Sequence, residues 1–276
     1  MAEITSAAVK ALRERTGLPM MDCKKALTEC QGDPEAAVQW LRERGLKIAG
    51  ERAGRETSFG TFGLYTSSTV GAIVELKCES APVAQNEEFR QLAADLAQQL
   101  ATGPGAADAE ALLDQPSPSK SGMTLREQRD ELFNRIREVF NVGRIQRFDG
   151  ATAGYVHSGA RVLGVLLEVE GGTEEIARDV AMHIAALRPT VVNVDELDPE
   201  AVEKERQILR SAALAEGKPE NIVDKMVEGR LRKEFFATQV LSEQPYVKDE
   251  SITVGKYAQQ NGMTLKRFVC WELGKE

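Results

Sequence analysis

Apolar side chains recur at helical spacing through the first 45 residues, and glycine or proline divides this pattern into three segments. Gly17 and Gly32 stand where the first two segments stop, as residues that end helices commonly do. Asp33 followed by Pro34 suits the start of the third segment, which Gly45 would close. The expected helices span residues 5–15, 20–30 and 33–45. Together they predict a small three-helix bundle.

A basic connector over residues 46–58 leads into an internal repeat of two strand patterns followed by a helix. The strands are expected at 63–66 and 71–76, then at 154–157 and 164–169, with helices at 86–101 and 173–187. Short turns join the strands of each pair, so each pair is antiparallel, with its helix over one face. A third strand for each copy is supplied by residues 142–148 and 265–271. The predicted fold class is α+β, with two related three-stranded subdomains.

Two further helices interrupt the second copy before its third strand. Asp198 and Pro199 begin a helix that runs to Ala215, residues 216–219 turn the chain, and a second helix covers 220–235. This pattern predicts an antiparallel helical hairpin that projects from the sheet. The apolar residues expected to face one another in the hairpin are Val202, Ile208, Leu209, Leu214, Ile222, Met226 and Leu231.

Glycine, proline and serine concentrate at residues 103–122 around a short helical pattern, which predicts a surface excursion before helix resumes over 125–140. The expected domains are a helical module with its linker (1–55), a first α+β subdomain (56–149) and a second (150–276) that carries the hairpin at 197–236.

The composition narrows the class of partner. The chain has 276 residues, of which 42% are hydrophobic and 28% charged, so it reads as a soluble globular protein with no membrane segment. Its net charge of -8 argues against a bulk electrostatic grip on nucleic acid. Residues 1–55 differ from the rest in the sign of their charge, because this segment contains ten basic side chains and eight acidic ones. A protein or a small molecule is the expected partner.

The four cysteines, Cys23, Cys30, Cys78 and Cys270, form no C-x-x-C pair. Without a signal peptide they indicate a reducing compartment, and we expect the cytoplasm. Because the two histidines stand apart from any ligand cluster, we expect no metal site. His183 falls on the apolar face of its helix and suits a core role, whereas His157 near a strand end is the better contact candidate.

No constellation typical of catalysis stands out. Ser117 and Lys120 match S-x-x-K, but in a proline-rich loop without the accompanying motifs. No glycine-rich phosphate loop follows a strand. We therefore expect no enzyme activity and no cofactor. The segment from Thr16 to Met21 is apolar where solvent is expected, and its two methionines suit either the core of the bundle or a binding surface.

Several short motifs stand out at residues 4–5, 13–17, 20–27, 182–186, 202–205, 217–219, 225–230, 244–245 and 253–255. Together these motifs resemble the bacterial elongation factor Ts family along nearly the whole chain. The resemblance implies a ubiquitin-associated-like helical module, a duplicated α+β core and a protruding helical hairpin. It also implies that these parts grip elongation factor Tu and release its GDP, and that the C-terminal helical module of some members is missing here.

The resemblance further implies which residues touch that partner. In the family an apolar pair corresponding to Met20 and Met21 docks on the nucleotide-binding domain, and Leu12 of the same module is expected to bind the partner as well. Ile136 aligns with a residue that supports an inserted loop, and His157 with a contact in the second subdomain. The expected exchange mechanism therefore has no catalytic residue of its own.

The inserted loop departs from the family. Its Thr-Asp-Phe-Val pattern, whose aromatic ring is pushed in near the magnesium site of the GTPase, is replaced by Ser80, Ala81, Pro82 and Val83. Ala81 has no side-chain acceptor and Pro82 is smaller than an aromatic ring, so a weaker wedge is expected. Alternatively, Pro82 biases Ala81 toward an extended shape and keeps a rigid apolar tip.

Two function hypotheses follow. The first is a guanine-nucleotide exchange factor for elongation factor Tu, with a homodimer in a 2:2 complex as one possible assembly and no direct contact to nucleic acid or membrane. The alternative is a chaperone-like paralogue that still binds elongation factor Tu but has weakened exchange, because the Asp-Phe pair is absent from residues 80–83. An enzyme is a distant third.

Overall fold

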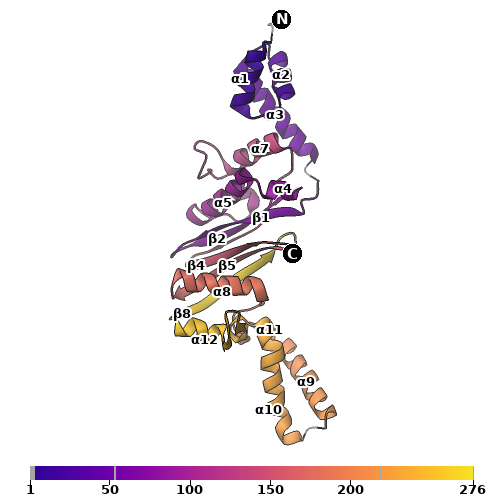
Figure 1. The fold of residues 1–276 in the computed structure, drawn as a ribbon, viewed down its shortest axis with the longest axis vertical. Helices are drawn as coiled ribbons and strands as arrows, with labels where there is room; N and C mark the ends of the chain where they lie inside the picture. The colour runs from indigo at the N-terminus through magenta and orange to yellow at the C-terminus, as the bar shows by residue number, and fades with distance from the viewer. Residues whose placement is uncertain (1–3, 53, 218, 276) are drawn as a thin grey trace. The chain divides into compact units, whose positions relative to one another are not determined.

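The computed structural model describes residues 4–52, 54–217 and 219–275, with the side chain of residue 221 left out. The chain divides into two compact units (Figure 1). One comprises residues 1–63, 74–146 and 273–276, and the other comprises 64–73 and 147–272.

The expected three-helix module begins the first unit. Its helices are α1 (Ser6–Thr16), α2 (Met20–Glu29) and α3 (Pro34–Arg52). Thr5 caps α1, and Gly17 ends it in a left-handed conformation at φ 68°, donating its N–H to the carbonyl of Arg13. The buried side chains of the module form a core of their own, made by Val9, Leu12, Leu18, Cys23, Ala26, Leu27, Ala37 and Leu41.

The third helix is longer than the sequence predicts. Gly45 does not end α3, which continues to Arg52 and takes up part of the expected connector. The glycine serves a close approach instead, since a Cβ at this position would lie 1.7 Å from Oδ1 of Asn134 on α7 (Leu125–Ile136). The expected stop was therefore wrong, because the absence of a side chain is needed for packing between two helices.

The first sheet has the order β1-β2-β3, with the expected third strand in place. Its strands are β1 (Phe59–Thr66), β2 (Gly71–Cys78) and β3 (Asn141–Phe148). The short α4 (Ala81–Ala84) follows β2, and α5 (Glu87–Thr102) follows α4, with Asn86 accepting hydrogen bonds from the N–H groups of Glu88 and Phe89 as its N-cap. Gly63 lets α5 approach β1 closely, because a Cβ there would lie 1.8 Å from the carbonyl oxygen of Ala93.

Residues 103–122 are anchored in the unit, contrary to the expected surface excursion. Leu112 and Leu113 of α6 (Ala109–Leu113) are fully buried. Ser117 donates to Gln128 over 2.7 Å, and Gln128 donates to the buried Asp95 over 2.7 Å, so the S-x-x-K serine has a structural role. Helix α7 ends at Ile136, earlier than expected.

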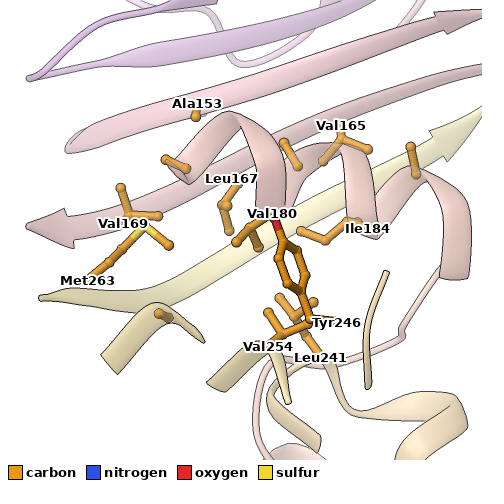
Figure 2. Packing of buried hydrophobic residues seen from close by; sticks show 14 residues of the cluster. Ala153, Val165, Leu167, Val169, Val180, Ile184, Leu241, Tyr246, Val254 and Met263 are labelled. Atoms are coloured by element: carbon orange, nitrogen blue, oxygen red, sulfur yellow. The ribbon is translucent and has the colours of Figure 1, made fainter. Parts of the chain in front are cut away.

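The second unit repeats the strand order as β4-β5-β8, which confirms the predicted third strand. Its strands are β4 (Ala151–Ser158), β5 (Val162–Gly171) and β8 (Met263–Glu272), and α8 (Glu174–Leu187) follows β5. Both strand pairs are antiparallel. Figure 2 shows Val180 and Ile184 of α8 between the strands and the segment that carries Tyr246 and Val254.

Each of the two sheets contains a cross-strand ion pair, and the two pairs lie at equivalent positions of the repeat. Glu75 on β2 pairs with Arg144 on β3 over 2.9 Å, and Glu168 on β5 pairs with Arg267 on β8 over 2.6 Å. Burial opposes ionisation of Glu75, but Arg144 and the N–H of Gly274 outweigh it and lower the pKa of the carboxyl. The copies thus retain a charged cross-strand pair as well as their topology.

The helical hairpin of the second unit is present, as α9 (Pro199–Ala215) and α10 (Glu220–Arg230) lie antiparallel in Figure 1. Lys218 of the expected turn lies outside the described residues. The expected interface was partly wrong, since Ile208, Leu214 and Ile222 are 42–53% exposed. The residues that form the buried interface are Leu209, Ala213, Val223, Val227 and Leu231.

Shorter elements connect the hairpin to the sheet. They are η1 (Val194–Glu196), the π-helical η2 (Leu231–Phe236), α11 (Ala237–Gln239), η3 (Leu241–Glu243), β6 (Pro245–Tyr246), β7 (Asp249–Thr253) and α12 (Val254–Gln260).

Candidate partner-binding site

The start of α2 presents two apolar side chains to solvent. Met20 is 50% exposed and Met21 is 73% exposed, so neither belongs to the core of the helical module. The same helix buries Cys23 and Leu27 on its inner face. Leu12 lies in that core at 3% exposure and presents almost no surface of its own. A pair of flexible, exposed methionines is typical of a surface that adapts to a protein partner.

Residues 80–83 form a helical turn. Ser80 is extended, at φ -138° and ψ 153°, and Ala81 is the first residue of α4. The expected extended shape of Ala81 was therefore wrong. Proline is tolerated in the first turn of a helix, and the bond from the Ala84 N–H to the Ser80 carbonyl closes this turn over 3.3 Å. Pro82 is exposed and Val83 half-buried, which leaves a small apolar tip on the surface.

Hydrogen bonds fasten this turn to the segment after α7. The hydroxyl of Ser80 donates to Oε1 of Glu138 over 2.7 Å, and the N–H of Val139 donates to Oε1 of Glu79 over 2.8 Å. Burial would raise the pKa of Glu79, but the bond from Val139 and the ion pair with Arg55 lower it. The Glu79 carboxylate is therefore kept ionised, and it connects the residue before Ser80 to Val139.

Cys78, which precedes Glu79, also forms a hydrogen bond to the turn. Burial raises the pKa of the Cys78 thiol to about 11. The protonated Sγ lies 3.3 Å from the carbonyl oxygen of Ser80, to which it donates. A thiol in this state is a poor nucleophile, so the position is structural.

The end of α7 connects α2 with the helical turn. Ile136 is half-buried and is the last helical residue, and Arg137 takes a left-handed conformation at φ 67°. Nη2 of Arg137 lies 2.8 Å from Oδ2 of Asp22, which follows Met21 directly. The carbonyl of Arg137 accepts a hydrogen bond from Nη1 of Arg52 over 2.6 Å. The structure thus links the methionine pair, the end of α7 and the Ser80 turn within one unit.

Sequence patterns did not indicate Arg137 or Glu138. Asp22 and Arg137 are separated by 115 positions, so no local periodicity relates them. Two of the side-chain atoms, Nη1 of Arg137 and Oε2 of Glu138, are buried and without a hydrogen-bond partner in the described part of the chain. Such atoms are uncommon in folded proteins, and each needs a physical explanation.

His157 lies in the other unit and does not take part in these contacts. It is exposed on β4, paired in register with Leu163. Its Nδ1 lies 3.3 Å from the hydroxyl of Tyr155, and the two ring centroids are 6.2 Å apart. His183 is fully buried, as expected, whereas the contact role of His157 stays a prediction.

Within residues 4–52, 54–217 and 219–275, no group of three or more His, Cys, Asp or Glu side chains is placed to hold a metal ion. Across the same described residues, every helix is too short or too polar to span a bilayer. The arrangement at Met20, Ser80 and Arg137 offers apolar contact and directed hydrogen bonds, which suit the binding of another protein.

Comparison with known proteins identifies the relatives of this chain. Residues 79–275 match the family model described as Elongation factor TS. Elongation factor Ts of Rhodospirillum rubrum is 40% identical over 293 residues, covering 100% of this chain and 94% of the relative. The Methylococcus capsulatus protein of that name is 43% identical, covering 99% and 92% of the two chains. That of Thioalkalivibrio sulfidiphilus is 40% identical with the same coverage.

Proposed function

The chain belongs to the elongation factor Ts family, and from that premise we propose that it binds elongation factor Tu and accelerates the release of GDP. Membership makes it a translation elongation factor. The proposed activity needs no catalytic residue, metal or cofactor, and it is exercised in the cytoplasm.

The mechanism is differential binding. A protein that binds the nucleotide-free GTPase more tightly than the GDP-bound form must, by linkage, weaken GDP binding by the same factor. Acceleration of release by ~10⁴-fold requires about 5.5 kcal/mol of preferential binding to the transition state. A few well-buried contacts can supply a free energy of this size.

The observation that carries the proposal is that one unit presents both the exposed Met20 and Met21 and the turn at residues 80–83. The methionines supply apolar area that can adapt to the partner. The turn supplies a small, rigid tip at Pro82, which is fastened through Ser80 to Glu138. We propose that this tip disturbs the magnesium site of elongation factor Tu without the aromatic ring of the family pattern.

Stopped-flow release of fluorescent GDP from the cognate elongation factor Tu tests the proposal. The wild-type chain should accelerate release in a saturable manner. Replacing Met20 and Met21 together by alanine should raise the half-saturating concentration about ten-fold, since exposed apolar anchors contribute on the order of 1 kcal/mol or more in an interface. The matched control is Leu46→Ala, which removes an apolar side chain of 54% exposure from the same module. This control should change the half-saturating concentration little.

Two results would contradict the proposal in different ways. Tight binding of elongation factor Tu without faster GDP release would mean that the protein only holds its partner, which is the chaperone-like alternative. Failure to bind at all would overturn both hypotheses. Light scattering of the free chain and of the complex would give the stoichiometry and so test a 2:2 assembly.

A further inference from the structure

Two consecutive residues join the segments of the proposed binding surface. The guanidinium of Arg137 pairs with Asp22, next to the exposed methionines of α2. The carboxylate of Glu138 accepts the hydroxyl proton of Ser80, at the start of the α4 turn. The pair at residues 137–138 therefore has one side chain directed to each segment, and we refer to it as the joint.

The backbone places these side chains in this way. Arg137 is one of three non-glycine residues with positive φ among those described, and its N–H donates to the Phe133 carbonyl over 2.6 Å to end α7. The left-handed residue ends the helix, and the side chains of the two residues that follow Ile136 reach Asp22 and Ser80, respectively. A non-glycine residue in this conformation carries a conformational cost of about 1 kcal/mol or more, which surrounding contacts must offset.

The contacts of the joint are sheltered. The side chains of Asp22 and Arg137 are 25% and 24% exposed, which makes this pair less exposed than most ion pairs among the described residues. The Arg137 carbonyl is also held by Arg52, at the end of α3. The helical module is thereby attached to the joint through both α2 and α3.

We propose that Arg137 and Glu138 are positioning residues, which hold the Met20–Met21 surface and the Ser80–Val83 turn in one arrangement so that the GTPase meets both at once. This inference rests on the proposed function. The helical module has its own small core, and its α3 packs against α7 where Gly45 meets Asn134, so the joint adds a second attachment through Asp22 of α2. Fixing two contact segments relative to each other raises the effective concentration of the second contact once the first has formed.

The test uses Asp22→Asn in the full-length protein, measured by affinity for elongation factor Tu and by stopped-flow GDP release. We expect an increase of about ten-fold in both the dissociation constant and the half-saturating concentration. Asp22→Glu keeps the charge and should stay within about three-fold of the wild type. Glu29→Gln removes the same charge from the exposed end of α2 and serves as the matched control.

A second background separates positioning from general destabilisation. In the protein with Met20→Ala and Met21→Ala, Asp22→Asn should weaken binding less than two-fold, because no methionine surface remains to be positioned. A ten-fold loss in that background as well would overturn the inference. So would an Asp22→Asn protein that binds and exchanges like the wild type.

Amide hydrogen exchange of the free chain tests the joint without the partner. Asp22→Asn should accelerate exchange at residues 137–139 and 79–85, and Ser80→Ala, which cuts the other arm, should accelerate it at 80–85. Unchanged exchange in both variants would overturn the inference even if one of them binds poorly. If the wild type fails to accelerate GDP release, the proposed function is wrong. The affinity and amide hydrogen-exchange measurements would still test whether Arg137 and Glu138 position the two segments.

Discussion

Gly45 and Gly50 show how one residue type has two roles in the same helix. Both lie within α3. A Cβ at position 45 would collide with the amide of Asn134, but a Cβ at position 50 would meet nothing within 4 Å. Asn134 is 8% exposed and its Oδ1 has no hydrogen-bond partner among the described residues, so the side chain has little room to move away. The first glycine is required by packing, and the second only weakens the helix.

We therefore predict opposite effects of alanine at the two positions. Gly50→Ala should increase the free energy of unfolding by about 0.5–1 kcal/mol, because alanine loses less backbone entropy in a helix. Gly45→Ala should decrease it by about 1–3 kcal/mol, the usual cost of overpacking. Denaturant titration measures both. The double variant Gly45→Ala with Asn134→Ala should recover part of the loss, and a stabilising Gly45→Ala would show that the close contact is unimportant.

At the scale of elements, the sequence predicted those helices and strands whose signals are local. Asn86 and the Asp198–Pro199 pair mark helix starts within one residue of those observed, and the internal repeat located both third strands. The hairpin faces were less well predicted because α9 and α10 carry more apolar residues than one interface can bury. Periodicity alone does not choose among them.

The candidate site was predicted only in part, because sequence patterns reveal local segments but not the long-range contacts between them. The methionine pair and the Ser80 turn stand out as short segments, but their connection through Arg137 and Glu138 depends on contacts across 115 and 58 positions, respectively. The shape of the turn was also missed. The preference of a residue before proline is a local tendency, and closure of α4 together with the bond from Ser80 to Glu138 outweighs it here.

The α4 turn makes a testable prediction about the departure from the family pattern. Ala81→Asp together with Pro82→Phe should increase the maximal rate of GDP release, because an aromatic ring offers a larger apolar wedge and an acidic residue is favoured in the first turn of a helix. Stopped-flow measurement at saturating protein gives this rate. Ala81→Ser with Pro82→Ala is the control without a ring, and an unchanged rate in the Asp-Phe variant would contradict the wedge mechanism.

At the scale of the whole molecule, we expect the two units to differ in their response to acid. The chain has two histidines, and both belong to the second unit. His183 is fully buried in α8, where Nδ1 accepts the N–H of Val247 over 3.2 Å and Nε2 lies 3.0 Å from Oε1 of Gln244. The ring is therefore neutral, with its proton on Nε2.

Protonation of His183 would disturb this arrangement. Burial lowers the pKa of His183, and the hydrogen bond to Gln244 opposes that shift only in part. Below the unfolded value of about 6.5, the unfolded chain binds a proton that the folded unit does not bind. The unfolded state is then favoured, so the stability of the second unit falls as the pH is lowered through this range, by at most about 1.4 kcal/mol per pH unit.

The two tryptophans allow each unit to be observed separately, since Trp40 lies in the first and Trp271 in the second. Thermal unfolding is followed by fluorescence in Trp40→Phe and in Trp271→Phe, between about pH 7.5 and about pH 5.5. The midpoint reported by Trp271 should fall more steeply on acidification than the midpoint reported by Trp40, because only the second unit contains a buried neutral histidine. His157→Gln, at the exposed histidine, should leave this difference unchanged, whereas His183→Gln should reduce it. Equal shifts of the two midpoints would mean that His183 does not set the acid response, or that the units unfold as one.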